Sequence, residues 1–467
     1  MKPKSNDLYR RILITIGLII LWRLFVFIPA PGIDSGVVKE FFPSNGDFKG
    51  ISILALGIMP YVSAYVLVEL FSLFLPPLKS WRKEGSFGRR KLLKTALVVT
   101  VFLSIVHGYI QSYMVIRGFN MVADGEAVNL PSTWSHLQTA LPLTVAVFFT
   151  LWIAHMITKK GVGHGISVIF FGGYAVSFLP RLYKGMMEAT QSVLRFEQFT
   201  FEDAGRVVLI LLVLFVFIAI IVVFERSVKK IPVEFDDGTK AHIPIKLTTA
   251  GTVPIGFGRE ALLLPILLLA GVIPSWVQQQ IFFSDSTFYY PINLIALVFL
   301  YYFFTFLFYS PERMIELLKS KNSSIVVPEG EDPSDLIKRS LKAMALAGLL
   351  YLSLFLLLSR MGMNSLTGGL VGVGLILTVV IAMDISGEVL FRSKSGRLSK
   401  VAEFHNIPIA GLAKSLLEER AIPCHLKGYY HRALLYFFGP YIEVSLLVPE
   451  DKSEEAKELM KRYLAHQ

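Results

Sequence analysis

The sequence predicts an all-α polytopic membrane protein of about ten transmembrane helices, followed by a small α+β domain in the cytosol. Of its 467 residues, 54% are hydrophobic and only 17% are charged, which is more apolar than a soluble domain. About ten apolar stretches approach the roughly 20 residues that a helix needs to cross a bilayer. Near Leu398 the composition changes and becomes mixed and polar.

The apolar stretches follow one another up to this change. Their approximate limits are 11–30, 51–75, 95–117, 139–158, 165–183, 207–224, 248–274, 290–309, 341–359 and 366–391. Basic residues concentrate before the first stretch, in every second connection and after the last stretch; only the fifth connection, with Arg181, Lys184 and Arg195, blurs the pattern. By the positive-inside rule both termini are cytoplasmic. The first stretch is long and continues into Pro29 and Pro31, so we expect a retained helix and not a cleaved signal peptide.

The second stretch, Ile51–Glu69, is interrupted at its centre by Gly57 and Pro60. A helix that only had to lie in lipid would gain nothing from this break. Broken helices at membrane depth are tolerated where the freed backbone is buried in protein or lines a wet cavity. The stretch therefore predicts a helix broken in the middle, beside a pathway through the protein.

The C-terminal part reads as a β-α-β-β-α unit, with strands at 401–405, 424–430 and 441–448 and helices at 410–420 and 453–465. About 70 residues can hold a small core of their own. The single cysteine, Cys424, excludes an internal disulfide and fits a reducing compartment.

Catalysis has little support in this sequence. The nine histidines are scattered without a metal-ligand spacing, the glycines of 161–165 lack a P-loop lysine, and Cys424 has no visible base. We therefore expect no enzyme activity, no cofactor and no metal. A secondary transporter is an alternative class, because its repeats pair broken helices. The stretches 51–75 and 248–274 correspond loosely in this way, but the broken helices show no polar substrate pocket.

Specific strings in the membrane part resemble the SecY family, the channel subunits of the bacterial Sec protein translocon, over residues 8–397. They are ISILALGIMPYVSAY, KEGSFGRRK, GVGHGIS, FERSVKKIPVEF and IPIKLTTAGTVP, in the family's order. The resemblance implies ten helices in two pseudo-symmetric halves in the bacterial cytoplasmic membrane. It also implies a protein-conducting channel that translocates unfolded preproteins and inserts membrane proteins sideways. A divergent accessory translocon or insertase with restricted substrates remains open.

By this resemblance, residues 1–397 form the channel and residues 398–467 a separate cytosolic domain. The second resembles small appended modules assigned to signal transduction. A ring of side chains would seal the channel around the passing chain; its implied members are Val62, Val66, Ile166, Phe170, Gly256 and Leu377. Gly256 stands where the family usually has a bulky aliphatic residue.

Two further residues belong to the expected lateral gate. Glu69 and Thr248 stand where relatives carry neutral amides, and our hypothesis is that they help to hold the gate closed. The acids near the inner end of the last helix, Asp384 and Glu388, are expected to be solvated.

The cytosolic loops are expected to bind partners through basic side chains. The candidates are Arg89, Arg90, Arg226, Lys229, Lys230, Lys338 and Arg339. The implied partners are SecE-type and SecG-type subunits, the motor ATPase SecA or the ribosome, preproteins and lipids. Three departures from the family pattern stand out. The segment before Ser52 is too short for a full plug, the sixth-loop tip carries Asp236 and Asp237, and Pro328 replaces a family arginine.

Overall fold

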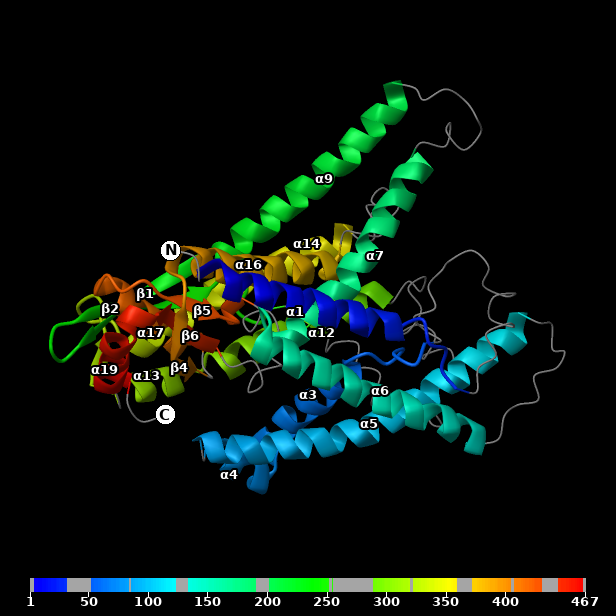
Figure 1. Cartoon of the computed structure of the whole chain (residues 1–467). Coiled ribbons are helices and arrows are strands. Elements are labelled where there is room, and N and C mark those ends of the chain that lie inside the picture. Colours follow the sequence, from blue (N-terminus) through cyan, green and yellow to red (C-terminus); the bar gives the residue numbers. More distant parts are fainter. Residues whose placement is uncertain are drawn as a thin grey trace. The chain divides into compact units, whose positions relative to one another are not determined.

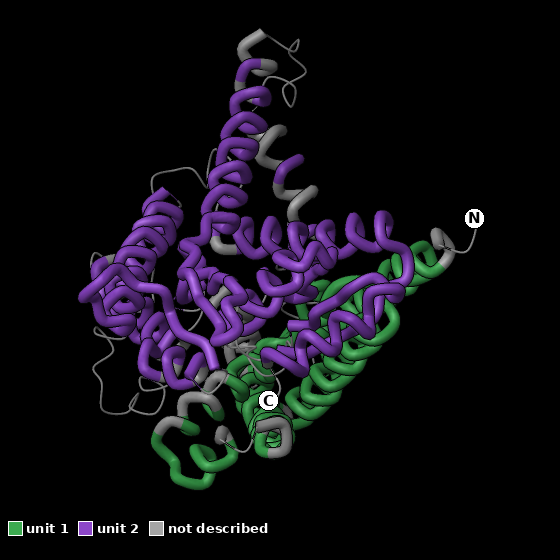
Figure 2. The backbone as a smooth tube through the Cα atoms, turned by 90° about the vertical axis from the view of Figure 1, so that its left-hand side faces the viewer, with its two compact units in different colours: residues 1–169, 467 green, residues 170–466 purple. Residues whose placement is uncertain are grey.

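The computed structural model describes residues 4–31, 52–83, 85–122, 133–189, 201–251, 254, 289–319, 322–358, 372–404, 407–430 and 444–464. The chain divides into two units, residues 1–169 with residue 467, and residues 170–466 (Figure 2). The division falls inside one helix, α7 (Gly165–Ala189).

The first unit is helical. Its elements are α1 (Lys4–Phe25), α3 (Met59–Phe74), α4 (Pro76–Lys83), α5 (Gly85–Val122), α6 (Thr133–Lys160) and the start of α7. Helices α5 and α6 approach closely at Gly108. A Cβ atom there would lie 2.9 Å from the Ala140 Cα atom. Small residues permit such contacts between membrane helices. The Trp22 indole donates to Thr150 Oγ1 at 3.3 Å and ties α1 to α6.

The second unit combines helices with two small sheets. Its helices before the C-terminal segment are the rest of α7, α9 (Phe201–Arg226), α12 (Tyr289–Phe308), α13 (Pro311–Lys319), α14 (Pro333–Leu358) and α16 (Val373–Ser395). Aromatic side chains join α9 to α14, with ring centroids 4.8 Å apart for Phe224 and Tyr351 and 5.4 Å apart for Phe217 and Phe355. These contacts fix the helix that leads into the first sheet.

The first sheet is built on a hairpin that follows α9. Strands β1 (Val228–Phe235) and β2 (Lys240–Lys246) pair antiparallel, β3 (Ser323–Ile325) joins β1, and the order is β2-β1-β3. Asp236–Thr239 connects the two long strands, and Gly238 at φ +78° takes a conformation that glycine reaches without strain. Strand β2 therefore lies at an edge of this sheet.

The C-terminal segment forms the second sheet and covers it with helices. Its elements are β4 (Leu398–Phe404), α17 (Ile407–Glu419), β5 (His425–Lys427), β6 (Val444–Pro449), a 3₁₀ turn (Glu450–Lys452) and α19 (Ser453–Leu464). The strand order is β4-β6-β5, all antiparallel. Where the structure describes this segment, its elements follow the predicted β-α-β-β-α order. Helix α17 packs on strand β2 of the hairpin (Figure 1), and α19 reaches the hairpin's turn through Tyr463.

Every predicted span except 248–274 overlaps a helix among the described residues. Residues 252–253 and 255–288 lie outside the described part, so the seventh span and the count of ten stay predictions. Within the described residues, five helices are long and apolar enough to cross a membrane by length and composition. They are Arg90–Ser112, His136–Lys160, Val207–Arg226, Pro333–Leu358 and Gly374–Ser395.

Candidate functional site

The interruption in the second span is real, but it is not a break between two half-helices. Residues 53–58 form turns, and α3 begins only at Met59 with Pro60 in its first turn. Gly57 has φ +53°, a left-handed conformation that disfavours side chains and keeps the helix from starting earlier. The Ile53 N–H donates to the Ile28 carbonyl at 2.9 Å, so these turns lie against the residues that follow α1.

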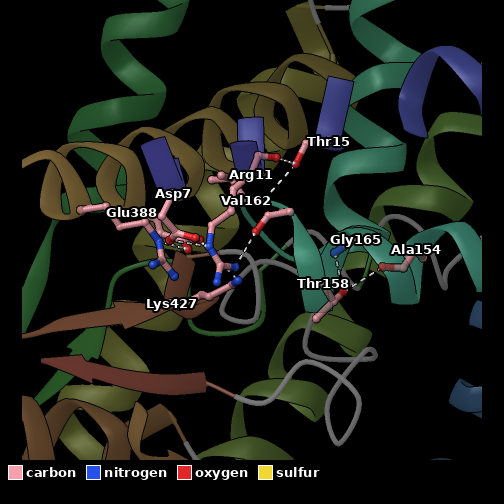
Figure 3. A network of polar contacts seen from close by, with 11 residues as sticks. Asp7, Arg11, Thr15, Ala154, Thr158, Val162, Gly165, Glu388 and Lys427 are labelled. Carbon is pink, nitrogen blue, oxygen red and sulfur yellow. Dashed lines mark hydrogen bonds and ion pairs between the residues drawn. The ribbon is translucent and has the colours of Figure 1, made fainter. Parts of the chain in front are cut away.

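The GVGHGIS string forms the tight corner between α6 and α7 (Figure 3). Thr15 on α1 accepts the Val162 N–H at 2.9 Å, and Thr158 on α6 accepts the Gly165 N–H at 2.8 Å. A Cβ atom at Gly165 would lie 1.7 Å from the Ala154 carbonyl oxygen, so only glycine fits there. The corner fixes where α7 starts, and with it the candidate ring position Ile166.

The structure places the predicted ring residues only in part. Val62, Phe170 and Leu377 are half-buried on α3, α7 and α16, and Ile166 is buried. Gly256 and the side chain of Val66 lie outside the described residues, as does the short segment before Ser52 that replaces a full plug. The ring as a whole therefore stays a prediction.

A buried ion pair stands at the base of the hairpin. The Lys246 ammonium lies 3.2 Å from Glu225 Oε2, with side-chain exposures of 1% and 0%. Thr248 Oγ1 donates to the same carboxylate oxygen at 3.2 Å. Burial lowers the pKa of Lys246, and the neighbouring Glu225 carboxylate opposes that shift. Nothing in the sequence distinguishes Lys246 from the other basic residues of this loop, so the site is visible only in the fold.

This arrangement bears on the gate hypothesis without testing it. Thr248 is 3% exposed, and its hydroxyl donates a hydrogen bond to Glu225 within the second unit. The side chain of Glu69 lies outside the described residues, so its expected pairing remains a prediction.

The predicted loop cations are mostly at the surface. Arg90, Arg226, Lys230 and Arg339 are exposed, Lys229 and Lys338 are half-buried, and the Arg89 side chain is not described. The ammonium of Lys338 lies 3.5 Å from Glu312, and the Arg339 guanidinium lies 2.6 Å from Glu331. Exposed pairs of this kind contribute little to stability.

One expectation about α16 was wrong. Asp384 and Glu388 are not solvated: they are 7% and 1% exposed. Glu388 bonds Arg392 at 2.8 Å and lies 3.5 Å from the ammonium of Lys427 on β5 (Figure 3). The C-terminal segment folds back over the end of α16, which the sequence did not indicate.

Comparison with known proteins agrees with this architecture. The SecY family model matches residues 52–386, and a protein translocase subunit SecY of Halalkalibacterium halodurans is 30% identical over 84% of this chain and 97% of its own. The chain belongs to the SecY family. The corresponding Escherichia coli K12 subunit is 28% identical over 83% of the chain and 92% of its own.

Solved structures share the SecY fold at low identity. A structure described as that of a protein conducting channel covers 84% of this chain and 94% of its own, at 15% identity and a TM-score of 0.53. Sec61 in a canine ribosome-channel complex is similar at 14% identity and a TM-score of 0.53. The predicted family is thus confirmed. This SecY-family chain is a channel subunit of the cytoplasmic membrane that crosses it several times, and not an enzyme.

Proposed function

We propose that this SecY-family chain conducts unfolded preproteins across a bacterial cytoplasmic membrane and releases apolar helices sideways into the lipid. The observation that carries the proposal is the delayed start of α3 after Gly57, in a span that otherwise has the length and composition to cross the membrane. A backbone freed at that depth must face protein or a wet pathway. A membrane channel for chains without fixed structure supplies such a pathway.

The seal would be the ring of Val62, Val66, Ile166, Phe170, Gly256 and Leu377. Apolar side chains suit this role because they exclude hydrated ions without binding the passing chain through polar groups. Gly256 has no side chain to contribute to this ring, and the larger Phe170 would compensate. Glu69 and Thr248 would lie at the lateral gate, beyond the ring on the cytosolic side.

The seal can be tested by ion leak through proteoliposomes that contain the channel. Phe170→Ala should raise the leak, because it removes the largest ring side chain. Phe299→Ala is the matched control, because Phe299 is 68% exposed on α12 and offers no seal. Equal leak from both variants would contradict the place of Phe170 in the ring.

The chain would span the membrane with both termini in the cytoplasm, as its basic residues indicate. Residues 398–467 would then be a cytosolic domain. SecE-type and SecG-type subunits would brace the channel, and energy would come from SecA or the ribosome. The acidic turn at Asp236 and Asp237 favours SecA, because a ribosome docks through RNA phosphates that these carboxylates repel.

The deciding experiment is a pulldown of the tagged protein in mild detergent from its native membrane, with mass spectrometry of the bound proteins. Recovery of SecE, SecG and SecA would support a general translocon. Recovery of the SecE-type subunit without motor or ribosome would support an accessory translocon or insertase, which the altered loops also favour. Recovery of no Sec component would contradict the proposal.

A further inference from the structure

Helix α17 is buried along most of its length, and part of that burial comes from outside its own segment. Ten of its residues are buried, from Ile407 to Leu417, and Lys414 is only half-buried. The β4-β6-β5 sheet covers one side of α17, and strand β2 of the hairpin packs on another (Figure 1). A helix that buries more than one stripe of side chains needs a partner on each of those faces. The C-terminal segment is thus built to sit on the hairpin.

The contact closes the open edge of β2. His242 faces Pro232 across the hairpin, and proline has no N–H to give, so the backbone groups of His242 point away from β1. Ser415 on α17 accepts the His242 N–H at 3.0 Å, and its hydroxyl lies 3.0 Å from the His242 carbonyl oxygen. An edge strand left uncovered pairs readily with other chains. Here one serine side chain occupies both free groups.

A close approach of α17 to the ring of Pro244 supports the same contact. A Cβ atom at Gly411 would lie 2.3 Å from Pro244 Cγ and 2.5 Å from its Cδ. The three atoms that it would meet first all belong to this one proline of β2. A larger residue at position 411 would therefore push against the hairpin while it favours the helix itself.

The turn of the hairpin is held by the last helix. Tyr463 on α19 donates to Asp237, its ring lies edge-on to Phe235 with centroids 5.0 Å apart, and Arg462 lies 3.4 Å from the same carboxylate. The Tyr463 and Thr239 hydrogen bonds lower the pKa of Asp237 to about 2, which keeps it ionised. Arg420, which follows the end of α17, donates to the Tyr463 hydroxyl at 3.4 Å.

The same segment also covers the base of the hairpin with two tyrosine rings. The buried Lys246 ammonium lies 4.5 Å from the centre of the Tyr430 ring and 5.4 Å from that of Tyr429. Nearby, Lys427 pairs with Glu388 on α16. The C-terminal segment therefore contacts the hairpin at its base, along its edge and at its turn, and it also contacts α16.

We propose that residues 398–467 are the resident occupant of the β1–β2 hairpin, and that a protein partner can reach the β2 edge and the Asp237 turn only after displacing α17 and α19. The partner is the motor ATPase SecA, so this inference rests on the proposed function. A protein can offer the arginine and tyrosine side chains that the turn binds here, whereas RNA would bring phosphates against Asp236 and Asp237.

The test uses the full chain with its SecE-type subunit in lipid nanodiscs. Gly411→Leu is the wedge variant, and Glu418→Ala, an exposed position on the same helix, is the control. Hydrogen exchange should become about tenfold faster in residues 240–246 of the wedge variant. Exchange in β6 should not change, because β6 belongs to the segment's own sheet. The affinity for purified SecA should rise about fivefold or more, and the control should match the parent chain in both readouts.

Tyr463→Phe provides a second variant if Gly411→Leu folds poorly. It removes the hydroxyl from Asp237, keeps the ring against Phe235, and should move both readouts in the same direction by a smaller factor. Unchanged exchange in residues 240–246 of both variants would overturn the docking. Faster exchange with unchanged SecA affinity would overturn the exclusion. Binding of SecA to neither form would overturn the inference and the partner assignment, while co-purification of the SecE-type subunit would still support the channel.

Discussion

Removal of the Lys246 charge should destabilise the second unit strongly. In Lys246→Met the Glu225 carboxylate stays buried at 0% exposure and loses a cation 3.2 Å away. Breaking one side of a buried pair costs about 3–5 kcal/mol, because a charge is left without compensation. At roughly 2 °C per kcal/mol, the Tm should fall by roughly 6–10 °C. The methionine keeps the apolar contact with Tyr430, so the loss reports the charge.

The matched control is the double variant Lys246→Met/Glu225→Gln. It removes both charges, and the glutamine still offers Thr248 an acceptor, so most of the lost Tm should return. Both proteins are melted in the same detergent and followed by tryptophan fluorescence. The reasoning is refuted if Lys246→Met has the same Tm as the parent chain. It is also refuted if the double variant loses as much Tm as the single variants Lys246→Met and Glu225→Gln lose together.

Three further outcomes follow from single side chains. Gly165→Ala should lower the Tm and the yield of folded channel, because its methyl would overlap the Ala154 carbonyl; Gly205→Ala, where nothing lies within 4 Å, should not. Burial lowers the pKa of His425 from 6.5 to about 4. The unfolded chain therefore binds more protons between these values, and stability should fall as the pH falls from about 6.5 to 4. His425→Phe, which keeps the stack on Phe391, should flatten this part of a Tm–pH curve. Burial also raises the pKa of Cys424 to about 12. Iodoacetamide at pH 8 should modify this half-buried thiol more slowly in the folded than in the denatured chain, as mass spectrometry would show, and equal rates would contradict the raised pKa.

Much of the fold could be predicted because membrane spans are a local property. Twenty apolar residues form a helix in lipid whatever their neighbours, so the predicted spans 207–224 and 290–309 coincide with α9 and α12. The strand β1 was not among the predicted elements, although Ile231, Val233 and Phe235 are buried at every second position, as in a half-buried strand. Family motifs added the order of these elements.

The buried charges could not be predicted, because burial depends on what the rest of the chain covers. Asp384 and Glu388 lie near the end of a span, where a sequence pattern alone indicates solvent. They are buried because β5 and the following turn return to the end of α16. In the sequence Lys246 resembles its basic neighbours. Only the hairpin places it against Glu225, which lies 21 residues earlier.

The sequence by itself determined that this chain is a membrane channel of the SecY family with an α+β tail, since apolar length, charge placement and family motifs can be read without a fold. Only the tertiary structure decided where the tail lies. Gly411 and Ser415 are small residues without an evident partner in the sequence, and they become a docking face only when β2, about 170 residues away, is placed against them. Contacts of that range depend on shape complementarity between distant segments, which no local pattern records.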